Sequence, residues 1–133
     1  RRRMLTAEAE GRMAAMLHLL PFRTELGRTT YIYGVATDPA FRGRGLASQL
    51  MREAMRLIAE RGDDAALLIP TPGKEWLREF YGRFGFAGDV PARFVSADRF
   101  DFGTGDAAAD RAMVWRRDSS VPLPEQLTAS WHS

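Results

Sequence analysis

The sequence predicts an α/β fold in which a mixed β-sheet carries a central strand–helix–strand crossover. The β-branched and aromatic run TTYIYGVAT, residues 29–37, is typical of a strand. Apolar residues then recur at helical spacing over residues 46–58, and a short apolar run follows at residues 65–70. Because strand, helix and strand follow one another closely, we expect the two strands to be parallel and the crossover to be right-handed.

A β-hairpin is predicted before the crossover. Residues 3–9 and 12–20 are expected to be strands, joined by a turn at Glu10 and Gly11. The segment MAAMLHLL in the second strand is almost wholly apolar, as in a strand that is covered on both faces. We expect Pro21 to end this strand, because proline cannot donate to a sheet ladder.

The crossover helix is predicted to present one apolar face and to end at Gly62, a typical C-terminal cap. That face is formed by Leu46, Leu50, Ala54, Leu57 and Ile58. A second helix is expected after the 65–70 strand. Thr71 can cap it, Pro72 suits its first position, and Gly82 or Gly85 can end it.

Two further strands are expected near the C-terminal end, because residues 90–96 and 111–117 alternate in polarity. The polar, acidic stretch 97–110 between them is predicted to be a loop. We therefore expect a single domain over residues 1–117, followed by a tail at 118–133 that lies on the surface or frays.

Composition restricts the function. The 133 residues suit one soluble globular domain, and a net charge of +2 is too small to indicate a nucleic-acid partner. Without cysteine the chain has no disulfide, thiolate metal site or cysteine nucleophile. His18 and His132 are far apart, so no metal is expected. No apolar run reaches the roughly 20 residues of a membrane span, and we expect a cytoplasmic protein with no membrane partner.

The stretch FRGRG at the start of the crossover helix allows two interpretations. The first helical N–H groups have no internal partner, so a glycine-rich entry can hold a phosphate, with Arg42 and Arg44 adding positive charge. Alternatively, Gly43 and Gly45 form only a turn and a cap, and Arg44 is a solvated loop charge. The stretch fits neither the P-loop nor the dinucleotide-binding pattern.

Two segments together resemble the GNAT family of N-acetyltransferases. VATDPAFRGRGLASQLM, residues 35–51, is similar to the family's acyl-CoA loop, Q/R-x-x-G-x-G/A, with Arg42, Gly45 and Ala47 at its defined positions. KEWLREFYGRFGF, residues 74–86, resembles the family's following helix, which typically ends in FYxKxGF. The resemblance covers about residues 12–117 and implies a mixed, mostly antiparallel sheet around the crossover.

The resemblance implies an acyltransferase that uses acetyl-CoA as a co-substrate and transfers the acetyl group directly to a primary amine. The crossover strands would separate to admit the pantetheine arm, and a backbone N–H would hold the thioester oxygen. Tyr81 matches the tyrosine that protonates the departing thiolate. The residues implied for cofactor binding are Val35, Ala36, Thr37, Arg42, Gly43, Arg44, Gly45, Leu46, Ala47 and Ser48.

Further candidate residues lie outside these motifs, and three of them keep two interpretations each. His18 is either the base that deprotonates the incoming ammonium or a structural strand histidine. Trp76 and Tyr33 line either the acceptor pocket or the core, and Glu79 is a further candidate base that is expected to face away from Tyr81. Lys74 stands where many relatives carry an asparagine that contacts the cofactor.

The acceptor is a small-molecule or peptide amine by the same resemblance, and family members often pair as homodimers. The family usually begins with a strand and two helices that wall the amine site, whereas this chain starts close to the hairpin. We therefore expect a domain without those helices, either because they precede residue 1 of this segment or because the acceptor site is open or completed by a partner. A non-catalytic acyl-CoA-binding regulatory module is the alternative function.

Overall fold

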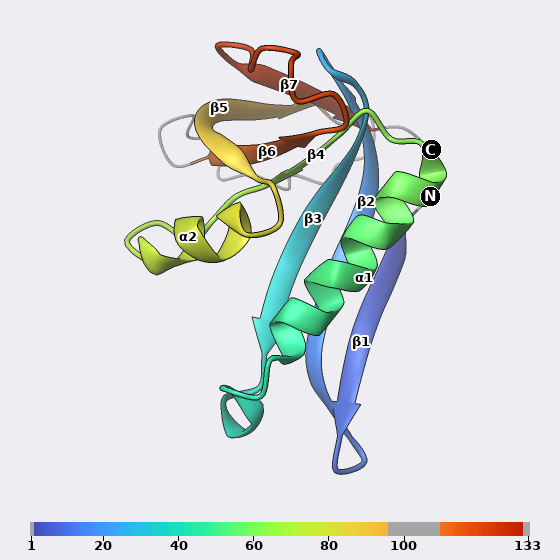
Figure 1. The fold of residues 1–133 in the computed structure, drawn as a ribbon, viewed down its shortest axis with the longest axis vertical. Coiled ribbons are helices and arrows are strands. Elements are labelled where there is room, and N and C mark those ends of the chain that lie inside the picture. Colours follow the sequence, from blue (N-terminus) through green and yellow to red (C-terminus); the bar gives the residue numbers. More distant parts are fainter. Residues whose placement is uncertain (1, 96–109, 132–133) are drawn as a thin grey trace.

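The computed structural model describes residues 2–95 and 110–131, which form a seven-stranded mixed sheet with two α-helices (Figure 1). This confirms the predicted α/β fold. Within these residues no helix is long and apolar enough to cross a membrane. In chain order the elements are β1 (Arg3–Ala9), β2 (Arg12–Thr24), β3 (Gly27–Thr37), the 3₁₀-helix η1 (Pro39–Phe41), α1 (Leu46–Arg61), β4 (Ala65–Leu68), α2 (Trp76–Gly82), β5 (Ala87–Val95), β6 (Arg111–Arg116) and β7 (Leu127–Trp131).

The turn between β1 and β2 forms at the predicted residues. Glu10 and Gly11 both have positive φ angles, 53° and 76°. A two-residue turn that matches the twist of an antiparallel pair requires positive φ at both positions. β1 and β2 pair antiparallel on either side of it, so the hairpin has a short, well-defined tip.

The prediction that Pro21 ends β2 is wrong, since the strand continues to Thr24. On one edge, β2 pairs with β1 as far as Leu19 and with β7 from Phe22 onward. Pro21 lies between these two stretches, where the ladder on that edge is interrupted. Proline is tolerated at such an interruption because no ladder bond from its nitrogen is needed.

The crossover β3–α1–β4 has the predicted parallel pairing. α1 covers one face of the sheet over β1, β2 and β3 (Figure 1). As predicted, Gly62 ends the helix in a left-handed conformation (φ 75°) and donates its N–H to the carbonyl of Ala59 at 3.1 Å. The buried residues of α1 are Leu50, Met51, Ala54, Leu57 and Ile58.

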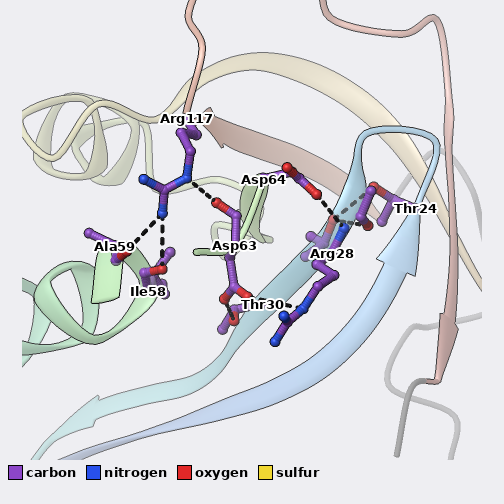
Figure 2. A network of polar contacts seen from close by, with 10 residues as sticks. Thr24, Arg28, Thr30, Ile58, Ala59, Asp63, Asp64 and Arg117 are labelled. Atoms are coloured by element: carbon purple, nitrogen blue, oxygen red, sulfur yellow. Dashed lines mark hydrogen bonds and ion pairs between the residues drawn. The ribbon is translucent and has the colours of Figure 1, made fainter. Parts of the chain in front are cut away.

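A polar network fixes the C-terminal end of α1 where β4 begins (Figure 2). The Arg117 guanidinium donates to the carbonyls of Ala59 at 2.9 Å and Asp63 at 2.7 Å. Thr30 of β3 donates its hydroxyl to the buried Asp63 carboxylate at 2.6 Å. A cation at a helix C-terminus is favourable, because the last carbonyls carry partial negative charge. The network therefore joins the end of α1 and the turn before β4 to β3 and to Arg117, which follows β6.

β3 and β4 separate beyond their short parallel contact (Figure 1). Pairing runs from Thr29↔Ala65 to Tyr31↔Leu67, and β4 ends one residue later. β3 continues to Thr37 with β2 on its other edge. The last part of β3 therefore has a backbone edge that no strand of the described chain pairs.

Residues 127–131 join the sheet as β7, which corrects the expectation that the whole C-terminal tail lies on the surface or frays. Residues 118–126 before it have no regular secondary structure and are mostly exposed. β7 pairs antiparallel with β2 at Phe22↔Trp131 and parallel with β5. Strands β2, β3, β4, β6, β5 and β7 thus form a closed ring. The ring encloses a core of Leu20, Phe22, Tyr31, Leu67, Val90, Ala92, Ala112, Val114, Leu127 and Ala129.

The second helix begins later than predicted. Thr71 is not its cap: the backbone N–H of Lys74 contacts the Thr71 carbonyl at 3.4 Å in a separate turn, and α2 starts at Trp76. Its end at Gly82 is one of the two predicted ends. The expected strands at residues 90–96 and 111–117 correspond to β5 and β6. The predicted loop between them lies, apart from Asp110, outside the described residues.

Candidate functional site

The connection between β3 and α1 has an open, glycine-dependent geometry. Gly43 and Gly45 have φ angles of 79° and 75°, a region that L-residues with side chains rarely adopt. A Cβ atom at either position would meet no atom within 4 Å. Space for a ligand therefore exists beside the backbone of residues 42–45, which we call the glycine loop.

The first turn of α1 presents donors next to the glycine loop. The first backbone bond of the helix runs from the N–H of Gln49 to the carbonyl of Gly45 at 3.0 Å. The N–H groups of Leu46, Ala47 and Ser48 precede it and have no helical acceptor. They combine with the positive end of the helix dipole, so this turn suits an anion such as a phosphate.

A cavity of about 550 Å³ lies between β3, the glycine loop and α2. All of the site residues predicted from the sequence line it, except Arg44. The structure thus gathers residues from three separate segments around one space. The lining residues are Val35, Ala36, Thr37, Phe41, Arg42, Gly43, Gly45, Leu46, Ala47, Ser48, Thr71, Lys74, Trp76, Leu77, Phe80 and Tyr81.

One wall of the cavity is the separated end of β3. Ala36 and Thr37 pair with Met16 and Ala15 of β2 on one edge. The opposite edge has no strand beside it in the described chain, because β4 has already ended. An extended ligand with amide groups can add to such an edge as an extra strand.

The opposite wall comes from α2. Tyr81 is 7% exposed, and its ring packs against Phe80 with a centroid distance of 5.2 Å. Burial raises the pKa of the Tyr81 hydroxyl above its usual value of 10.0. The side chain is therefore fully protonated at neutral pH and is suited to donate a proton. Trp76, which is 64% exposed, forms part of the same wall.

The two arginines of the glycine loop have different environments. Arg42 lines the cavity, and its side chain makes no ion pair with the described residues. Arg44 does not line the cavity: its Nη1 contacts Glu10 Oε2 at 2.9 Å, and its guanidinium lies 4.9 Å from the centre of the Phe41 ring. Of the two arginines that were expected to border the site, only Arg42 therefore lines the cavity.

Only some of the other candidate residues line the cavity. Lys74 and Trp76 line the cavity, whereas His18 and Tyr33 do not and instead face each other with a ring-centroid distance of 6.4 Å. Glu79 is also outside the lining and is ion-paired with Arg83 at 3.4 Å.

The sequence interpretation did not assign Phe41, Thr71, Leu77 and Phe80 to the site. For two of these residues the sequence contained a signal, namely their helical spacing from other candidate residues. Leu77 lies four residues before Tyr81, and Phe80 lies four residues after Trp76, so each shares a helix face with a residue already considered. Phe41 and Thr71 lie in irregular segments, whose direction no periodic pattern indicates.

Comparison with known proteins identifies a family and a set of similar folds. A model of the acetyltransferase (GNAT) domain matches residues 1–88. No curated protein matches the chain. Among solved structures, a GNAT family N-acetyltransferase of Escherichia coli in complex with CoA is similar at 21% identity and a TM-score of 0.64, covering 97% of this chain and 66% of that one.

Two further structures are similar. A GNAT family acetyltransferase of Elizabethkingia anophelis with acetyl-CoA bound has 16% identity and a TM-score of 0.65, covering 86% of this chain and 76% of that one. One of Brucella melitensis in complex with acetyl-CoA has 18% identity and a TM-score of 0.61, covering 98% and 66%. At these identities the likeness is one of fold. This chain spans just under two thirds of the Escherichia coli and Brucella proteins.

Proposed function

The chain belongs to the acetyltransferase (GNAT) family, and we propose that it is an acetyl-CoA-dependent N-acetyltransferase that transfers an acetyl group directly to a primary amine. One observation carries this proposal: a single cavity is lined by the glycine loop, by the unpaired end of β3 and by Tyr81. A donor with phosphates at one end and a thioester at the other needs an anion site and a proton donor in one continuous space.

The residues present fit such a donor. Open space beside Gly43 and Gly45 leaves room for a pyrophosphate against the backbone. The N–H groups of Leu46, Ala47 and Ser48 would bind it, and the Arg42 guanidinium would add a charge-assisted contact. The unpaired β3 edge at residues 35–37 would hold the amide groups of the pantetheine arm as an added strand.

The chain's own groups would then assist transfer. Acetyl-CoA supplies the acetyl group as an activated thioester. One backbone N–H among Val35, Ala36 and Thr37 would stabilise negative charge on the thioester oxygen while the amine attacks. The new C–N bond forms as the C–S bond breaks, and the amine nitrogen loses a proton to solvent. Tyr81 would protonate the departing thiolate and regain a proton from solvent. A buried, fully protonated tyrosine supports this assignment.

Thermal unfolding with and without acetyl-CoA tests the proposal. A ligand at a hundred times its dissociation constant adds about 2.7 kcal/mol to the free energy of unfolding. At about 2–8 °C per kcal/mol, the midpoint should rise by several degrees. In Gly45→Glu a carboxylate would enter the anion site, so the shift should disappear.

The matched control is Gly62→Glu at the other end of α1. Gly62 has the same φ of 75° and the same open surroundings, so the backbone strain is alike, but it does not line the cavity. This variant should keep the acetyl-CoA shift. Equal loss of the shift in both variants would contradict the assignment of the glycine loop.

Turnover with a panel of small-molecule and peptide amines tests the catalytic half of the proposal. We expect release of free CoA that depends on the amine. Binding of acetyl-CoA without turnover of any amine would instead favour a non-catalytic acyl-CoA-binding module.

A further inference from the structure

The tip of the β1–β2 hairpin, residues 9–12, contacts the connection between β3 and α1 through charged side chains. Glu10 Oε2 accepts a hydrogen bond from Arg44 Nη1 at 2.9 Å. Arg12 Nη2 donates to Asp38 Oδ2 at 3.2 Å. One turn of the hairpin therefore holds residues at both ends of the β3–α1 connection.

Phe41 joins these contacts to the cavity. Its side chain is 3% exposed and forms part of the cavity wall. The guanidinium of Arg12 lies 5.2 Å from the ring centre, and that of Arg44 lies 4.9 Å from it. Both distances suit cation–π contacts. One aromatic ring thus contacts an arginine of the hairpin, an arginine of the glycine loop and the proposed donor site.

Asp38 organises the beginning of the same connection. Its Oδ1 accepts the N–H of Ala40 at 2.9 Å and caps η1, while its own N–H donates to the carbonyl of Ala14 in β2 at 2.8 Å. The Ala40 N–H, and after it the Arg12 guanidinium, hold the pKa of Asp38 below its usual range. The carboxylate is therefore charged at neutral pH, as its contact with Arg12 requires.

These contacts explain why Arg44 is turned away from the cavity. A loop with two glycines loses much conformational freedom when it is ordered around a ligand. Contacts that order it in advance reduce that loss at the moment of binding. Each exposed ion pair contributes little alone, but the two pairs share one buried ring between them.

We propose that the hairpin tip positions the glycine loop for the phosphates of the donor. Glu10 and Arg12 act through Arg44, Asp38 and Phe41 and touch no ligand themselves. Arg44 is thus a positioning residue, and Arg42 is the arginine that meets the phosphates. This inference rests on the proposed function, since it concerns the same glycine loop.

The competing role for Arg44 predicts an opposite result. If Arg44 were a phosphate contact that Glu10 holds back, then Glu10→Gln would free it and remove a negative charge, and acetyl-CoA would bind more tightly. If Glu10 positions the loop, the same substitution weakens binding. The loss expected from one exposed ion pair is about two- to fivefold in the dissociation constant.

The experiment is isothermal titration of acetyl-CoA and of S-acetylpantetheine, which lacks the phosphates, into wild type, Glu10→Gln, Arg44→Gln and the double variant. We expect each single variant to weaken acetyl-CoA binding and the double variant to be no weaker than the weaker single one, because both remove the same contact. Binding of S-acetylpantetheine should not change. Tighter or unchanged acetyl-CoA binding in Glu10→Gln, or an equal loss for both ligands, would overturn the inference.

Glu60→Gln is the matched control, because Glu60 is an exposed carboxylate ion-paired with Arg56 on α1 and does not line the cavity. It should leave both affinities unchanged. Hydrogen exchange without ligand separates this inference from the proposed function. Amides of residues 41–48 should exchange faster in Glu10→Gln than in Glu60→Gln, whether or not wild type binds acetyl-CoA. Equal exchange in the two variants would mean that the hairpin tip does not order the loop.

Discussion

Tyr81 combines a position on the cavity wall with a hydroxyl that burial keeps protonated. Desolvation disfavours the charged tyrosinate, so the pKa rises and the group cannot serve as a base near neutral pH. The same shift leaves it as a proton donor over the whole neutral range. The role that we propose for Tyr81 therefore depends on one oxygen atom, which a conservative substitution can remove without changing the packing.

We expect Tyr81→Phe to lower kcat by about 10²–10⁴-fold, the usual contribution of a general acid, with little change in KM for acetyl-CoA. In wild type, deprotonation of Tyr81 should cause no loss of kcat between pH 7 and 9, because its pKa lies above 10.0. Steady-state kinetics across this range measures both effects.

Tyr33→Phe is the control for this substitution. Tyr33 is 41% exposed and does not line the cavity, so loss of its hydroxyl should leave kcat unchanged. Full activity in Tyr81→Phe would show that another group protonates the thiolate.

At the scale of elements, the crossover β3–α1–β4 was predictable because its signals are local. A β-branched run, an apolar helical face and a capping glycine each act over a few residues. The start of α2 was mispredicted because Thr71 and Pro72 resemble a helix entry but belong to a separate turn. β7 was missed although Leu127, Ala129 and Trp131 alternate, since its partners lie far away in the sequence.

In the candidate site, too, local patterns were predictable from the sequence and contacts between distant residues were not. The glycine pattern and the resemblance of the second helix indicated the residues that now line one cavity. The orientation of Arg44 could not be predicted, because it depends on Glu10, which lies 34 positions away in the hairpin tip. Which of two neighbouring arginines faces a site is decided by such distant partners, and no local pattern contains that information.

Arg117 provides a test of how the crossover is held together. Its guanidinium satisfies backbone carbonyls at the C-terminal end of α1 and at Asp63. Both are bonds from a charged group, and the one to the Asp63 carbonyl is partly buried. Arg117→Ala should therefore reduce the free energy of unfolding by about 1–3 kcal/mol. Chemical denaturation measures this loss.

Arg52→Ala is the comparison for Arg117→Ala. Arg52 is an exposed arginine of α1 for which the described residues provide no ion pair, so its removal should change stability by about 0.5 kcal/mol or less. Equal effects of the two substitutions would mean that the network at the end of α1 contributes nothing specific.

At the scale of the whole molecule, the closed strand ring and the cavity are separate. The ring core includes Leu127 of β7, and none of the residues of that core lines the cavity. Leu127→Ala should therefore reduce the free energy of unfolding by about 2–5 kcal/mol through loss of buried apolar contacts. The affinity of the remaining folded protein for acetyl-CoA should not change.

Denaturation and titration on the same Leu127→Ala sample check both parts of this prediction. Val121→Ala is the control, because Val121 is 40% exposed and lies outside the ring core. A large loss of affinity in Leu127→Ala would show that ring closure also shapes the cavity that we propose as the donor site.

Closure of the ring by β7 also has a consequence in time. The Thr128 N–H donates to the Glu25 carboxylate across 103 sequence positions, beside the pairing of β7 with β2. At about 5–20 residues per second, a ribosome needs roughly 5–20 s to add the chain between these two residues. During that interval the growing chain carries the far end of β2, with Phe22, before its partner strand exists. An unpaired strand edge of this kind is a site at which nascent chains associate, so chaperones would be most needed in those seconds.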